Sequence, residues 1–219
     1  MRALLALVLV TVVILAGLFE SSPAEAANEL ANATFSNASG LEGWSLWAVG
    51  SGFTPCSAAP DCGPFHFVAD ECCGAGASGS VEGTSQTGTA PPTILAQCIA
   101  VPPGSYDYGA WIRVTNLPAG IGADKLPRVD VIWWTDANCT GTPSVAIPRP
   151  PGVDSPTWQS VGMGNIVAPG APVATQTALI MFLVPNADDA ATTVTARFDN
   201  AIFGPTGTVP VELQTFTVD

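Results

Sequence analysis

Residues 105–115 alternate so regularly between two kinds of side chain that they restrict the fold of the whole chain. One set of alternate positions holds Tyr106, Tyr108, Ala110, Ile112 and Val114, and the other holds Asp107, Gly109, Trp111, Arg113 and Thr115. Successive side chains of a β-strand point to opposite faces, so this pattern predicts a long strand with one buried face.

Other segments predict further strands and are separated by turn residues. We expect these strands over residues 28–37, 43–49, 65–70, 93–101, 128–135, 158–167, 174–184 and 192–203. Only 11% of the residues are charged, the chain has 22 Gly and 20 Pro, and helical periodicity is missing. Strands at this spacing predict an all-β fold, an antiparallel β-sandwich.

The first 26 residues predict a signal peptide. Arg2 is followed by an apolar run, and Ala24-Glu25-Ala26 matches a small-residue cleavage site. A retained membrane anchor is the alternative, but the run is short for a span. We therefore expect a secreted, extracellular protein without a membrane segment after cleavage. Its single domain covers residues 27–205, and residues 206–219 form a C-terminal extension.

Six cysteines, all beyond the expected cleavage site, predict a fold stapled by disulfides. Four of them lie close together in a segment, about 50–90, that we expect to be an insertion: Cys56, Cys62, Cys72 and Cys73. The other two lie on or beside predicted strands, and we expect a bridge between Cys98 and Cys139. The sequence leaves the connectivity of the crowded four open. A zinc site is a rival, but adjacent cysteines lack the usual spacing and the single His66 has no histidine partner.

Charge and motif content exclude several classes of function. The net charge of −12 gives a surface that repels nucleic acid and anionic membranes. The only histidine, His66, lies between two phenylalanines, and the sequence has no nucleophile elbow, paired metal-binding histidines or phosphate loop. Carboxylates are numerous, so a two-carboxylate glycosidase stays as a third alternative. We expect a protein without catalytic residues.

Two tryptophans with charged neighbours form the expected ligand site. Trp111 and Arg113 share one face of their strand, and Asp130 and Trp134 share one face of the strand at 128–135. If both strands belong to one sheet, the four residues line one surface. An indole ring stacks on the apolar face of a pyranose, while Arg and Asp bond its hydroxyls. The alternative is that the Cys-rich segment covers this face and the tryptophans pack beneath it.

An Asp-Asn pair interrupts the closing strand at Asp199 and Asn200, both poor strand formers. One explanation is a structural calcium site that uses Asp199 with backbone carbonyls from the first strand. The other is a hydrogen-bonded bulge without an ion. Both remain open at this point.

Six short motifs occur in a familiar order. They are Asn32-Ala33-Thr34-Phe35, Gly40-Leu41-Glu42-Gly43-Trp44, Gln97-Cys98-Ile99-Ala100-Val101, Pro103-Gly104-Ser105-Tyr106, Trp158-Gln159 and Phe198-Asp199-Asn200-Ala201. This order resembles the galactose-binding-like jelly rolls among carbohydrate-binding modules, the kind appended to bacterial cellulases and xylanases. The resemblance covers roughly residues 28–205.

The resemblance implies a jelly roll that binds polysaccharide or another glycan, in a concave sheet face or at the loop rim, often with structural Ca²⁺. Family members often carry Glu or Asp after the Phe of the first motif, where this chain has Ser36. Because one jelly roll serves many purposes, the runner-up is an extracellular structural or adhesive protein that binds protein partners instead of sugar.

Overall fold

The computed structural model describes most of the chain between residues 28 and 207. The described ranges are 28–36, 40–48, 52–57, 60–72, 78–88, 92, 94–141, 143–145, 149–170 and 174–207. The expected leader, Cys73 and residues 208–219 lie outside these ranges. Within the described ranges, no helix is long and apolar enough to cross a membrane.

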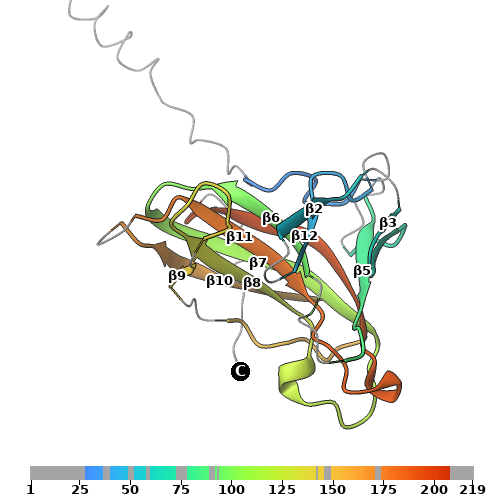
Figure 1. Ribbon diagram of the computed structural model, residues 1–219. Helices are drawn as coiled ribbons and strands as arrows, with labels where there is room; N and C mark the ends of the chain where they lie inside the picture. The colour runs from blue at the N-terminus through green and yellow to red at the C-terminus, as the bar shows by residue number, and fades with distance from the viewer. Residues whose placement is uncertain are drawn as a thin grey trace, which may run out of the picture.

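The described residues form short strands and long strands with two brief 3-10 helices (Figure 1). The elements are β1 (Ser45–Ala48), β2 (Gly52–Pro55), β3 (Asp61–Cys62), β4 (Phe65–Val68), β5 (Ser80–Thr84), β6 (Ile94–Ala100), β7 (Gly104–Asn116), η1 (Ala123–Lys125), β8 (Arg128–Trp134), β9 (Pro143–Val145), β10 (Gln159–Ala168), β11 (Thr177–Leu183), η2 (Ala190–Thr192) and β12 (Thr195–Pro205).

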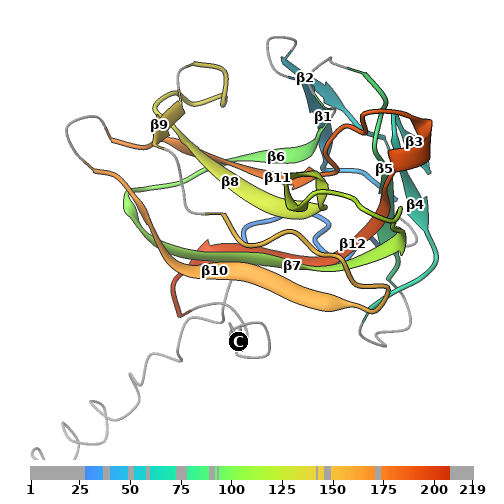
Figure 2. The same cartoon turned by 90° about the horizontal axis from the view of Figure 1, so that it is seen from below.

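Two antiparallel sheets of six strands face each other (Figure 2). The first sheet has the order β2-β1-β6-β11-β8-β9, and the second has the order β10-β7-β12-β5-β4-β3. The predicted all-β antiparallel sandwich is therefore confirmed. The expected disulfide between Cys98 and Cys139 is present, and Cys56 is bonded to Cys62 within the crowded segment.

Stacked aromatic rings join the two sheets at one end of the core. Trp44, which precedes β1, lies 4.7 Å from Phe182 of β11, and Phe182 lies 4.7 Å from Phe198 of β12 (ring centroids). The Phe35 ring stacks on Trp44 at 5.4 Å and also lies 6.0 Å from Phe182. Each of these four side chains is at most 1% exposed. Burial of rings this large contributes strongly to the stability of the sandwich.

The strand expected over residues 28–37 is wrong. Asn32 and Phe35 have left-handed backbone angles, with φ of 48° and 47°, which a strand does not allow. The Asn32 side chain donates from Nδ2 to the carbonyl of Gly40 at 2.8 Å and accepts from the Ser36 N–H at 3.0 Å. Asparagine tolerates this geometry, so the segment folds as a turn that carries Phe35 into the core.

The segment about 50–90 takes part in both sheets. It supplies β2 at an edge of the first sheet and β3, β4 and β5 at one end of the second sheet. None of the strands expected from the sequence falls between residues 71 and 92, so β5, whose short run contains Gly83, was not predicted. A side chain at Gly83 would lie 2.5 Å from the Phe65 ring, so the close approach of β4 requires glycine there.

Candidate functional site

The strands that carry the predicted ligand site lie in different sheets. From the sequence, four residues are expected to share one face: Trp111, Arg113, Asp130 and Trp134. However, β7 pairs with β10 and β12, whereas β8 pairs with β11 and β9. Tyr106 of β7 and Trp133 of β8 meet across the core with ring centroids 5.6 Å apart. Trp111 and Arg113 therefore point outward from the second sheet. Asp130 and Trp134 point outward from the first sheet, so the expectation of a shared face is wrong.

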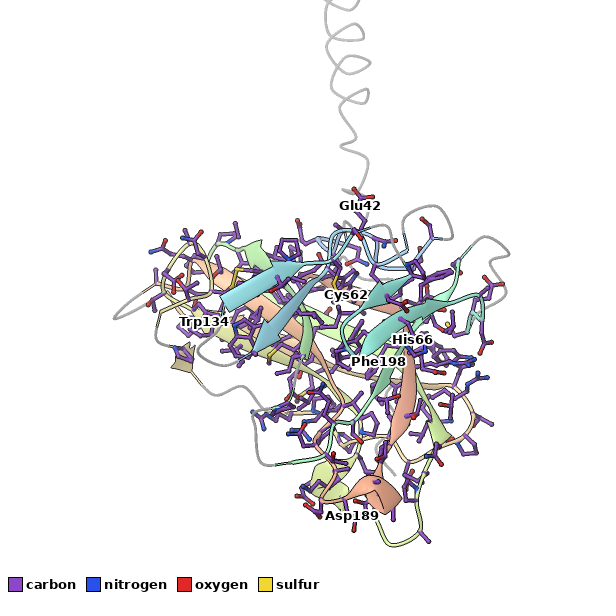
Figure 3. All side chains as sticks on the ribbon, turned by 45° about the vertical axis from the view of Figure 1, so that its right-hand side comes forward. Glu42, Cys62, His66, Trp134, Asp189 and Phe198 are labelled. Atoms are coloured by element: carbon purple, nitrogen blue, oxygen red, sulfur yellow. A yellow bond between two sulfur atoms is a disulfide. The ribbon has the colours of Figure 1, made fainter. Side chains whose placement is uncertain are left out.

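Trp134 lies in an apolar cluster on the outer face of the first sheet. It is 5% exposed and clusters with buried side chains of β6 and β11, including Leu179 and Met181. The Trp47 ring packs edge to face against the Trp134 ring, with their centroids 6.4 Å apart. The centroid of the Phe53 ring lies 6.4 Å from that of Trp47. Figure 3 shows Trp134 well separated from His66, which belongs to the second sheet. This face is mainly apolar and aromatic.

Asp130 supplies the charge on the same outer face. It is 2% exposed, and its Oδ2 accepts from Arg128 Nε at 3.2 Å and pairs with Arg149 Nε at 3.4 Å. Its Oδ1 is buried without a hydrogen-bond partner, and so is Nε1 of Trp134. Unpaired buried polar atoms are uncommon in folded proteins, so these two atoms are unusual features of this face.

Trp111 and Arg113 contribute to a second group of side chains, on the outer face of the second sheet. Ser160 of β10 lies opposite Trp111 of β7, and the next outward position before β10 is Trp158. The Arg113 guanidinium carbon lies 5.1 Å from the Trp158 ring centroid, a cation–π contact. We call these four residues the tryptophan patch. Both tryptophans are partly exposed, while Nε of Arg113 and Oγ of Ser160 are buried without a partner.

A row of charged residues crosses the second sheet beside the patch. Arg197 of β12 lies opposite Arg113 of β7 and Glu82 of β5, and Glu82 lies opposite His66 of β4. Glu82 accepts from Arg197 Nε at 2.7 Å, and its Oε1 lies 3.0 Å from His66 Nε2. Burial raises the pKa of Glu82, but the hydrogen bonds and charges of Arg197 and His66 outweigh it and leave the pKa below its usual value.

Residues 70–72, which we call the strap, lie over part of this row. Oδ2 of Asp70 accepts from both Arg113 and Arg197. The Cys72 N–H donates to Oδ2 of Asp199 at 2.9 Å. The Cys-rich segment thus covers the arginines and Asp199, as the alternative expectation held, but both tryptophans of the patch keep part of their surface exposed.

Asp199 and Asn200 form a bulge in β12. The register with β7 shifts between Asp199 and Ile202, and Asn200 has a φ of 43°. Oδ1 of Asp199 accepts from its neighbour's N–H at 2.6 Å. Burial, with the nearby carboxylates of the strap, raises the pKa of Asp199 to about 6, although the hydrogen bond from Cys72 opposes the shift.

The arrangement around Asp199 does not fit the calcium site that was one of the two explanations of the Asp-Asn pair. Each of its carboxylate oxygens accepts a backbone N–H, one from Cys72 and one from Asn200. No group of three or more His, Cys, Asp or Glu side chains is placed to hold a metal ion in the part of the chain that the structure describes. Calcium needs several oxygen ligands, so we derive no ion site from these residues.

Four residues on or over the second sheet's outer face were not predicted from the sequence: Asp70, Glu82, Trp158 and Arg197. Alternation in the closing strand could have placed Arg197 outward, because its neighbours Ala196 and Phe198 are apolar and buried. Which strands lie beside it depends on long-range pairing. Asp70 reaches the site from a loop, and its sequence neighbourhood has no pattern that points there.

No family model matches this sequence, and no curated protein is similar to it. Several solved structures are similar in fold. The enzymatically active domain of bacteriophage CBA120 tailspike protein 4 has a TM-score of 0.48 and 16% identity over 81% of this chain, which spans only 21% of that chain. TmCBM61 in complex with beta-1,4-galactotriose has a TM-score of 0.45 and 12% identity, covering 82% of this chain and 99% of that one. The K3 cleaved adhesin domain of Lys-gingipain from Porphyromonas gingivalis w83 has a TM-score of 0.41 and 16% identity, covering 83% of this chain and 99% of that one. At TM-scores below 0.5, these similarities carry no argument about what the chain binds.

Proposed function

We propose that this chain is a secreted, non-catalytic domain that binds carbohydrate through the tryptophan patch. The observation that carries the proposal is the position of two unpaired polar atoms, Arg113 Nε and Ser160 Oγ, beside two partly exposed indole rings. Buried donors and hydroxyls normally have partners, and because both atoms have almost no accessible surface, a small shift of the side chains around them would open them to a ligand with hydroxyl groups. The disulfides support an extracellular location.

The chemistry of the patch suits a sugar. An indole ring offers a flat apolar surface to the C–H face of a pyranose. Arg113 Nε is a donor only, whereas the Ser160 hydroxyl both donates and accepts, so the two together match a sugar hydroxyl in either role. The guanidinium is already held against the Trp158 ring, which limits the ordering needed when a ligand binds.

A glycan array with matched variants tests the proposal. Trp111→Ala and Trp158→Ala each remove one stacking surface, and we expect either to weaken binding by about fivefold or more, since a stacked ring contributes about 1 kcal/mol or more. The control is Trp47→Ala, which removes a partly exposed indole from the other sheet and should leave glycan binding unchanged. The proposal fails if wild type binds no glycan, or if all three variants bind as wild type does.

The apolar outer face of the first sheet favours a second candidate, a protein-binding role. Trp47, Phe53 and Ile132 are partly exposed around the buried cluster that contains Trp134. Contiguous exposed apolar surface marks interaction sites in soluble proteins. Sedimentation velocity at rising concentration tests this role in its simplest form, self-association. Loss of association in the Trp47→Ala, Phe53→Ala double variant would support it, and a monomer at all concentrations would count against self-association.

A further inference from the structure

Two arginines face each other directly across strands of the second sheet. Arg113 of β7 and Arg197 of β12 are register partners, and both side chains are mostly buried, at 24% and 22% exposed. Like charges in directly opposite positions destabilise a sheet. A local rule broken in this way, without an evident gain in packing, is typical of a functional site. We call these two residues the arginine pair.

A single carboxylate oxygen bonds to both arginines of the pair. One guanidinium nitrogen of Arg113 and one of Arg197 both donate to Oδ2 of Asp70. Arg197 has a second acidic partner, because its Nε donates to Glu82 at 2.7 Å. For Arg113, Asp70 is the only acidic partner among the described residues, and Nε of Arg113 stays unpaired. The arginine pair therefore forms an anion site that is occupied by the protein's own carboxylate.

The occupying carboxylate does not belong to the sheet. Asp70 comes from the strap, two residues beyond the end of β4, and its side chain is 34% exposed. The backbone of the strap attaches to the same face through the Cys72 N–H and Asp199. A carboxylate that reaches the arginines from a surface segment can be exchanged for one that comes from a ligand, because the two sheet strands need not move.

We propose that the arginine pair recognises the carboxylate of an acidic sugar, a uronic acid, and that Asp70 occupies the site as an internal competitor. The inference rests on the proposed function, because Arg113 belongs to both the arginine pair and the tryptophan patch. A uronate ring stacked at the patch would direct its carboxylate toward the guanidinium groups, which bind carboxylates in a planar fork. A neutral sugar would bind at the patch without displacing Asp70.

Calorimetric titration of the full chain with trigalacturonate and with galactotriose tests this inference. Asp70→Asn removes the competing charge and preserves the shape of the side chain. We expect this variant to bind trigalacturonate about tenfold more tightly than wild type, with galactotriose affinity unchanged within about twofold. Adding Arg197→Gln to Asp70→Asn should abolish the gain. The control, Asp61→Asn, removes the same charge from the same sheet without touching the arginine pair, and should behave as wild type.

The outcomes separate this inference from the proposed function. If Asp70→Asn and Asp61→Asn bind trigalacturonate equally, Asp70 is not a competitor and the inference is overturned, while galactotriose binding that depends on Trp158 would still support the proposed function. If Asp70→Asn binds trigalacturonate more tightly and the gain persists when Trp158→Ala is added, the anion site is supported. The role of the tryptophan patch in stacking on sugar is then overturned. If neither probe binds any variant, both are overturned.

Discussion

The outer faces of the two sheets carry the same kinds of residue in different surroundings. The first sheet places Trp134 in an apolar cluster and isolates one buried carboxylate, Asp130, between arginines. The second sheet places Trp111 beside a row of charged residues that extends from Arg113 to His66. A tryptophan two to four residues from a charge in the sequence therefore does not define a site. The neighbouring strands decide whether the indole is packed or presented.

The largest expected effect separates the two tryptophans that the sequence treats alike. Trp134→Ala should lower the free energy of unfolding by about 3–5 kcal/mol, because the side chain is 5% exposed and leaves a cavity. Trp111→Ala should cost about 1–2 kcal/mol, because this ring is only partly buried, against Ile202. Urea unfolding measures both. Equal losses would mean that Trp111 is packed as firmly as Trp134, and the contrast between the two faces would then be wrong.

The next largest effect is a difference in how much the two described disulfides stabilise the folded chain. Cys98–Cys139 ties β6 to the segment after β8 with a sequence separation of 41, whereas Cys56–Cys62 has a separation of 6. Closing the longer loop removes more conformational entropy from the unfolded chain, about 4 kcal/mol against about 2 kcal/mol.

Thermal or urea unfolding of the two double Cys→Ser variants checks this order. Each variant keeps the other bridge and so serves as the other's control. A larger loss for the Cys56–Cys62 variant would show that the short bridge acts mainly on the folded state, at the point where the chain passes from the first sheet to the second.

The smallest expected effect is a difference in pH dependence between the two regions. On the second sheet, burial raises the pKa of Asp199 to about 6 from an ordinary value of 3.8. The folded state therefore keeps a proton that the unfolded state has released, so this stabilisation, on the order of 2–3 kcal/mol, is present below pH 4 and is lost as pH rises through 6. Near β8, hydrogen bonds from Thr140 and Asn138 lower the pKa of Asp136. Its stabilisation is present above pH 4 and is lost as pH falls further.

Urea midpoints between pH 3 and pH 7 measure the two slopes separately. Asp199→Asn should remove the decline in stability as pH rises from 4 to 6. Asp136→Asn should remove the rise in stability as pH increases from 3 to 4. If Asp199→Asn leaves the decline unchanged, the strap does not hold Asp199 in the environment described above.

Several elements could be predicted from local pattern alone. The alternation of residues 105–115 corresponds to β7, and the poor strand formers Asp199 and Asn200 coincide with a bulge. The prediction of a strand over residues 28–37 was wrong because Asn32 closes a turn with its own side chain, and hydrophobic alternation does not detect such a contact. β5 was missed because Gly83 is required by a neighbour from another strand.

By itself, the sequence predicted the all-β class, the buried face of the strand at residues 105–115, and the Cys98–Cys139 bridge. It placed Trp111 with Arg113 and Asp130 with Trp134, each pair on one face of its own strand. Only the tertiary structure decided that these pairs point away from each other, and that Trp158, Arg197 and Asp70 join the first of them. The physical reason is that alternation follows from backbone geometry within one strand, whereas the neighbours across a sheet follow from pairing between segments far apart in the chain.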